Sequence, residues 1–136
     1  MRRPSGLIIV GLLAACGQAN EGGSPIDMCN DPASTCVLSN GMSLQTRQTP
    51  TVLTPIDVIV RDVSTSVTSV RLEASMAAMS MPPVGVDLRS SGPSEWSGQL
   101  ILPVCSQGRS DWQWTLVTRV GNGEQRTTVQ VEAGQR

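Results

Sequence analysis

The sequence predicts a small all-β domain, an antiparallel β-sandwich of immunoglobulin-like type. Three observations lead to this fold class. Short runs that alternate between apolar and polar residues recur through the second half of the chain, and Gly, Pro and Asn residues that favour turns separate them. No window of useful length has helical apolar spacing with caps. Six or seven such strands in one small domain are typical of a two-layer sandwich.

The expected strands follow one another from residue 57 to the C-terminal region. A β-branched run occupies residues 57–63, and alternating runs occupy residues 67–74, 84–88 and 96–102. The clearest alternation extends from Trp112 to Val120, with Trp114 on the same face as Trp112. It leads into Gly121-Asn122-Gly123, a typical hairpin turn, so a return strand is expected up to Val131.

The core of this domain contains very few aromatic residues. The 136 residues are 39% hydrophobic and include three Trp but no Phe and no Tyr. Val, Leu, Ile and Met therefore fill the interior, with Trp112 and Trp114 covering it and their indole N–H groups reaching backbone or water. The net charge is −1 and no basic patch is concentrated anywhere, so no nucleic-acid partner is expected.

The N-terminus has the features of an export signal. Arg2 and Arg3 precede an apolar run at residues 7–15, which is too short to span a bilayer as a helix but suits a secretory signal. The run ends in Leu-Ala-Ala-Cys16, which resembles the lipobox of bacterial lipoproteins. The alternative is an ordinary signal peptide that is cut near Ala15, with Cys16 incidental.

The lipobox resemblance implies a lipid-anchored protein on the periplasmic side of the bacterial envelope. Cys16 would carry the acyl chains and become the mature N-terminus, and Gly17 after it favours the outer membrane. We expect four segments in the chain. They are a lipoprotein signal peptide (1–15), the lipidated Cys with a flexible Gly/Ser/Asn-rich tether (16–27), a Cys-bearing N-terminal segment (28–50) and the β-sandwich domain (51–136).

Three further cysteines remain once Cys16 is assigned to the anchor. Because the compartment is oxidising, a disulfide is expected, and Cys29 and Cys36 bracket an Asn-Asp-Pro turn signal. A local Cys29–Cys36 bridge is our first hypothesis, and the alternative is a bridge from either of them to Cys105. The remaining thiol is then either buried and inert or a soft metal ligand.

The residue inventory argues against an enzyme. The chain has no His, Lys or Tyr, which removes the commonest general acids and bases. No Ser lies in a nucleophile-elbow motif, and the scattered carboxylates form no motif pair. We therefore expect no catalytic residues; a redox role for the cysteines is an alternative.

The remaining chemical feature is a methionine-rich stretch. Met76, Met79 and Met81 lie within six residues and are followed by Pro82-Pro83, which end a strand or mark an edge. Thioether sulfur is a soft ligand that selects Cu(I), so these three methionines, together with Cys105, form a candidate metal site. Two alternatives stay open: the methionines fill the core in place of aromatic residues, or they form a hydrophobic surface for a partner.

The order of these motifs resembles FixH-like and YtkA-like domains. The resemblance rests on a Met-rich run that ends in Met-Pro, a Trp-x-Gly-x-Leu-x-Leu-Pro strand and then a Trp-led strand; the matching positions are Met76, Met79, Met81, Pro82, Trp96, Leu100, Leu102 and Trp114. It covers about residues 50–132. It implies an immunoglobulin-like domain of a membrane-attached or exported protein, in a family linked to copper handling. The absence of His and the presence of Cys105 depart from the family pattern.

These observations predict an exported envelope lipoprotein that binds or relays Cu(I). The alternative is a structural or protein-interaction module of the envelope that binds no metal. In both cases the lipid anchor makes the membrane a partner, and another envelope protein is a candidate partner.

Overall fold

The computed structural model describes residues 26–76, 81–104 and 110–134, and these residues form an all-β protein. This confirms that the domain is all-β; the immunoglobulin-like sandwich stays a prediction. No helix occurs in the described residues, and none of them forms a segment that could cross a membrane as a helix. The strands are β1 (Asp27–Cys29), β2 (Cys36–Val37), β3 (Ser43–Thr46), β4 (Ile56–Arg61), β5 (Ser69–Ser75), β6 (Val84–Gly92), β7 (Glu95–Leu100), β8 (Asp111–Val120) and β9 (Gly123–Glu132).

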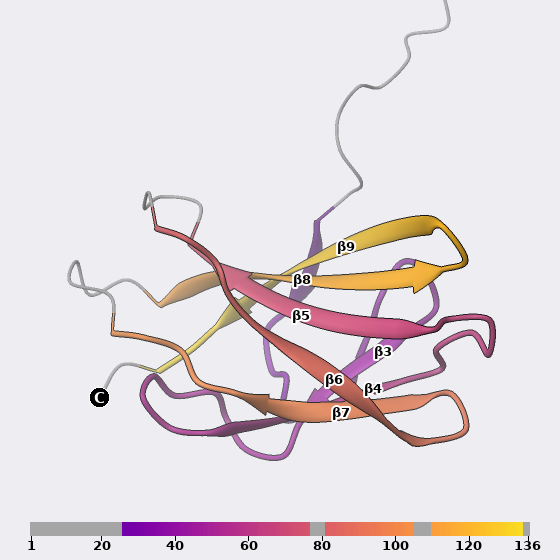
Figure 1. Cartoon of the computed structure of the whole chain (residues 1–136). Coiled ribbons are helices and arrows are strands. Elements are labelled where there is room, and N and C mark those ends of the chain that lie inside the picture. The colour runs from indigo at the N-terminus through magenta and orange to yellow at the C-terminus, as the bar shows by residue number, and fades with distance from the viewer. Residues whose placement is uncertain (1–25, 77–80, 105–109, 135–136) are drawn as a thin grey trace, which may run out of the picture.

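All nine described strands belong to one sheet, in the order β1-β9-β8-β5-β6-β7-β4-β3-β2. We expected six or seven strands in two separate layers. The difference comes from β6, whose first half pairs with β5 up to Leu88 and whose second half pairs with β7 from Arg89 onward. Figure 1 shows β6 passing diagonally from one group of strands to the other. We call β1, β9, β8 and β5 the first layer and β7, β4, β3 and β2 the second layer.

A glycine makes room for the crossing of β6. Gly98 of β7 pairs with Val58 of β4, and its missing side chain leaves space for Leu88 of β6. A Cβ atom at residue 98 would lie 2.8 Å from Leu88 Cδ2, closer than real Cβ contacts allow. The strand β6 therefore crosses the sheet at a position where β7 has a glycine and no side chain blocks the way.

The core lies between the two layers and follows the predicted alternation. Ile56, Val58 and Val60 of β4 are buried, and the residues between them are half-buried. The same pattern holds in β5, and in β8 it buries both tryptophans completely. The described core also includes Met42, Leu44, Val52, Val63, Leu72, Leu100, Leu102, Val129 and Val131. Aliphatic side chains thus fill most of the interior, as the composition predicts.

A disulfide joins the two strands at the ends of the sheet order. Cys29 of β1 and Cys36 of β2 are bonded, with their Cα atoms 5.7 Å apart, which confirms the first hypothesis from the sequence. Two side-chain hydrogen bonds reinforce this closure: the Ser39 hydroxyl donates to Asp27 Oδ2 at 3.0 Å, and Asn40 Nδ2 donates to Thr127 Oγ1 at 2.8 Å. The sheet therefore curls toward a barrel and is closed by a covalent bond.

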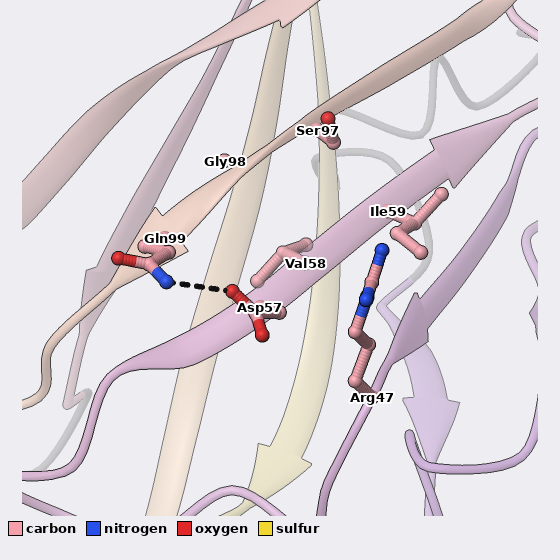
Figure 2. A pocket seen from close by; sticks show the side chains of 7 residues that line it. All are labelled: Arg47, Asp57, Val58, Ile59, Ser97, Gly98 and Gln99. Carbon is pink, nitrogen blue, oxygen red and sulfur yellow. Dashed lines mark hydrogen bonds between the residues drawn. The ribbon is translucent and has the colours of Figure 1, made fainter. Parts of the chain in front are cut away.

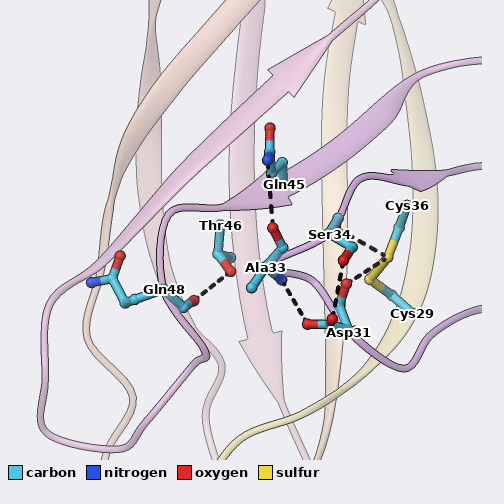
Figure 3. The surroundings of a disulfide bond; sticks show 8 residues. All are labelled: Cys29, Asp31, Ala33, Ser34, Cys36, Gln45, Thr46 and Gln48. Atoms are coloured by element: carbon cyan, nitrogen blue, oxygen red, sulfur yellow. Dashed lines mark hydrogen bonds between the residues drawn. A yellow bond between two sulfur atoms is a disulfide. The ribbon is translucent and has the colours of Figure 1, made fainter.

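The loop inside the disulfide is a hydrogen-bonded turn centred on Asp31. Its carboxylate accepts hydrogen bonds from the Ala33 N–H at 3.2 Å and from the Ser34 hydroxyl at 3.0 Å (Figure 3). Its carbonyl oxygen accepts the Ser34 N–H at 3.0 Å. The Pro32 carbonyl accepts the Thr46 N–H at 2.7 Å, which fixes the loop to β3. An Asn-Asp-Pro turn of this kind brings the two cysteines together locally.

The expected segment boundary at residue 50 stays a prediction. The structure adds that β3, on its N-terminal side, pairs with β4 on its C-terminal side, from Thr46↔Val58 to Ser43↔Arg61. The predicted hairpin between β8 and β9 is present, and Gly121 supplies its positive φ of 57°.

Candidate functional site

The methionine-rich stretch lies at the connection between β5 and β6. Met76 follows β5 on the inward-facing side of the chain and is 3% exposed, within the core. Met81 is half-buried and packs against the same core, just before Pro82-Pro83 and the start of β6. Met79 lies outside the described residues. Met76 and Met81, the two methionines of this stretch that the structure describes, therefore both pack against the core.

The described residues offer little else that could hold a metal ion at this place. They contain no group of three or more His, Cys, Asp or Glu residues in metal-binding proximity. Cys29 and Cys36 are joined to each other, so neither provides a free thiolate. Cys16 and Cys105 lie outside the described residues, as does Met79. Copper binding stays a prediction.

Trp112 and Trp114 lie wholly within the core, as their shared strand face predicts. We expected their indole N–H groups to reach backbone or water. Both Nε1 atoms are buried, and neither has an acceptor within the part of the chain that the structure describes. A buried donor without a partner is costly, so the large apolar contact of these rings has to offset that cost.

The outer face of the first layer carries a chain of alternating charges. Salt bridges connect Asp87 of β6, Arg71 and Glu73 of β5, Arg126 and Glu124 of β9, and Arg119 of β8 in that order, with N–O distances between 3.0 and 3.5 Å. Two of these salt bridges lie within a single strand, and the other three join different strands. The hydrogen bond to Glu73, reinforced by the charge of Glu124, raises the pKa of Arg126 above its ordinary value. Each of these six side chains already has a partner of opposite charge, so a charged ligand on this face would have to compete with an existing salt bridge.

The outer face of the second layer is different and contains a shallow hollow of about 330 Å³. It spans β4 and β7 and the residue that follows β3, and Arg47, Asp57, Val58, Ile59, Ser97, Gly98 and Gln99 line it (Figure 2). Gln99 Nε2 donates to Asp57 Oδ1 at 2.8 Å, and the Arg47 N–H donates to the Asp57 carbonyl at 3.1 Å. The carboxylate is thus turned toward Gln99, while the Arg47 side chain lies beside Ile59 in Figure 2.

Arg47 has no hydrogen-bonding or ionic partner for its guanidinium among the described residues. The same is true of Arg89, which pairs in register with Ser97 at the other side of the hollow. The guanidinium of Arg61, on the same face, does have partners: it forms a salt bridge with Glu95 at 3.2 Å and donates a hydrogen bond to Gln45 Oε1 at 2.6 Å. The hollow therefore combines an unpaired cation with an apolar side chain, Ile59, and a hydroxyl, Ser97. This combination suits a carboxylate at the end of an apolar or extended segment.

The sequence alone does not predict this hollow. Its residues come from three separate segments, around 47, 57–59 and 97–99, and only the pairing of β4 with β7 brings the last two together. The available signal was weak: Asp57 and Ile59 alternate with core positions and therefore had to face outward. Nothing in the sequence indicates that Arg47 joins them.

The comparisons with known proteins give little information about function. No family model and no curated protein matches the chain. An engineered protein, solved by crystallography as a structural-genomics target, is similar at 20% identity with a TM-score of 0.46. The similarity covers 76% of this chain and 21% of that one, so this chain spans about a fifth of its length. A likeness at this level assigns no function.

Proposed function

We propose that the chain is a lipid-anchored protein of the bacterial envelope whose β-domain is a non-catalytic interaction module. In this proposal the module binds a carboxylate-bearing segment of another envelope protein in the hollow at Arg47. The proposal rests on the unpaired guanidinium of Arg47, which lies beside Ile59 in a hollow that Ser97 also lines. On the outer face of the first layer, by contrast, Arg71, Arg119 and Arg126 all have acidic partners.

The strand pairing supports an immunoglobulin-like sandwich as the scaffold. In such folds one layer contains the pairs A–B and B–E, and the other contains C–F and F–G. The pairs β3–β4 and β4–β7 follow the first pattern, and β5–β8 and β8–β9 follow the second. Under this correspondence β6 is the strand that changes layers. Binding surfaces on such scaffolds need no catalytic group, which agrees with the absence of His, Lys and Tyr.

The membrane anchor is the second part of the proposal. It rests on the lipobox-like Leu-Ala-Ala-Cys16 and on the Gly-rich stretch that follows, which lie outside the described residues. Metabolic labelling with an alkyne analogue of palmitate tests it in cells that express the full chain. We expect label on the wild-type chain and none on Cys16→Ser, with the protein in the outer-membrane fraction only when Cys16 is present. Equal labelling of the two chains would contradict the anchor.

An unpaired arginine is the feature that favours binding energetically. A partner carboxylate at Arg47 breaks no existing salt bridge, whereas one at Arg71 or Arg126 competes with Glu73. Arginine is enriched at binding hot spots because its planar head holds a carboxylate with two parallel hydrogen bonds. Ile59 beside it supplies the apolar contact that makes such a pair favourable.

Photocrosslinking in living cells tests the binding face. A benzophenone amino acid replaces Ile59 in the hollow, and the matched control replaces Val117 on the outer face of the first layer. Both residues are half-buried, β-branched and outward-facing. We expect one discrete heavier adduct from position 59 and none from position 117. The proposal fails if both positions give the same adducts, or if position 59 gives none.

Copper binding is the second candidate function. Its supporting observation is that Met76 and Met81 pack on one core at the same connection, and that Met81 is half-buried rather than fully enclosed. Titration of the purified chain with Cu(I) against a chromophoric chelator tests it. The copper proposal predicts one ion per chain and loss of that ion in the Met79→Leu, Met81→Leu double variant. An unchanged stoichiometry would reject it.

A further inference from the structure

The outer edge of β9 is only half covered. The short strand β1 pairs with Val129, Gln130 and Val131 of β9 and with no residue before them. From Gly123 to Thr128 no strand lies on that side of β9 in the described part of the chain. Figure 1 shows this stretch as an open border of the sheet next to the β8–β9 turn. An uncovered sheet edge presents N–H and C=O groups to any strand that approaches it.

Two hydrogen bonds fix which residues of β9 present these groups. The Arg119 carbonyl accepts the Thr68 N–H at 2.8 Å and therefore points toward β5, away from its partner Glu124. The Ala133 N–H donates to the Ser110 carbonyl at 2.9 Å, so the odd-numbered residues of β9 direct their backbone N–H and C=O groups toward β8. Because the pattern alternates along an antiparallel pair, Glu124 and Arg126 direct their N–H and C=O groups out of the sheet.

These two residues carry opposite charges at positions that are self-complementary. In an antiparallel pair of identical strands centred on Gln125, Glu124 lies opposite the second copy's Arg126, and Arg126 lies opposite the second copy's Glu124. Registers centred on residue 124 or 126 place Glu opposite Glu or Arg opposite Arg, which is destabilising. We propose that two copies of this chain associate by pairing their β9 edges around Gln125, which joins the first layers into one continuous sheet.

The local chemistry fits this register. The two Glu124–Arg126 pairs exchange about four backbone hydrogen bonds, because directly opposite residues of this type bond twice. Gly123 lies opposite Thr127, whose hydroxyl already accepts Asn40 Nδ2, and the missing side chain leaves room there. The surface is narrow, so the association is weak and reversible in solution. The pairing involves the first layer, whereas the Arg47 hollow lies on the second layer. A test of the pairing is therefore independent of the proposed function.

Disulfide trapping tests the pairing in the full chain. In a Cys105→Ser background, Gln125→Cys places two thiols directly opposite each other, at a Cα separation of about 4.5 Å that suits a disulfide. The matched control is Thr127→Cys, whose counterpart in the second copy lies about 13 Å away along the strand. Cells expressing each variant are treated with an alkylating agent, and the extracts are run on non-reducing gels.

We expect at least ten times more disulfide-linked dimer from Gln125→Cys than from Thr127→Cys. Adding Glu124→Arg to Gln125→Cys removes the dimer, since Arg then faces Arg, and adding Arg126→Glu as well restores it. Circular dichroism of the purified variants checks that each one folds. Equal trapping of Gln125→Cys and Thr127→Cys overturns the proposal, as does a dimer that survives Glu124→Arg or an adduct of Gln125→Cys with a different protein.

Discussion

Cys29 and Cys36 are seven residues apart in the sequence, yet they belong to the first and last strands of the nine-stranded sheet order. The disulfide therefore forms within a short turn but links the two ends of a nine-stranded sheet. Loss of this bond would free β1, which makes three residue pairs with β9, and β2, which makes two with β3.

Reduction of this disulfide should destabilise the domain measurably. The bond closes a short loop, and the loop-entropy relation gives about 2.5 kcal/mol for a ring of this size. We expect reductant to lower the free energy of unfolding in urea by about that amount. In a Cys29→Ala, Cys36→Ala variant the reductant should have no effect. An unchanged urea midpoint for the reduced wild-type protein would mean that the bond does not hold the sheet closed.

A side chain at Gly98 should disrupt the crossing of β6. Gly98→Val pushes against Leu88, which is buried, and overpacking of this kind costs about 1–3 kcal/mol. Ser97→Val, one residue earlier on the outward face, is the control and should cost little. Leu88→Ala added to Gly98→Val should recover part of the loss. If the two substitutions are additive in urea melts, Leu88 does not occupy the space above Gly98.

Met76 should behave as a core residue. Met76→Leu conserves volume and should cost less than about 1.5 kcal/mol, whereas Met76→Ala should cost about 2–5 kcal/mol. Met28, which is 62% exposed, is the matched control, and Met28→Ala should change the urea midpoint little. Equal effects of Met76→Ala and Met28→Ala would show that Met76 is accessible, and this result would favour the copper hypothesis.

The longer strands of the sheet could be predicted from the sequence because apolar and polar residues alternate in them. Residues such as Val58, Leu72 and Trp114 repeat with a period of two, and the structure buries all three. The three short strands β1, β2 and β3 gave no such signal, since they contain two to four residues each. The layer change in β6 also escaped prediction, because it depends on the contact between Leu88 and Gly98 rather than on any periodicity.

The site was harder to predict than the fold. The methionine run can be recognised as a candidate site because its residues are close together in the sequence, but Met76 is enclosed in the core. Arg47 is a single arginine in an unremarkable polar stretch. It becomes a candidate binding residue only when β4 and β7 pair beside it and Arg61, Arg71, Arg119 and Arg126 prove to have partners. Such information is a property of the folded sheet and has no local signature.

Recognition of a partner carboxylate by Arg47 is tested most directly by the yield of the Ile59 crosslink in cells that express Arg47→Glu. We expect at least a ten-fold loss of the adduct, because a glutamate at residue 47 repels the partner's carboxylate. Arg119→Glu, a charge reversal of the same size on the other layer, should leave the yield unchanged. An Ile59 adduct that forms equally well with Glu at residue 47 would show that Arg47 does not recognise a partner.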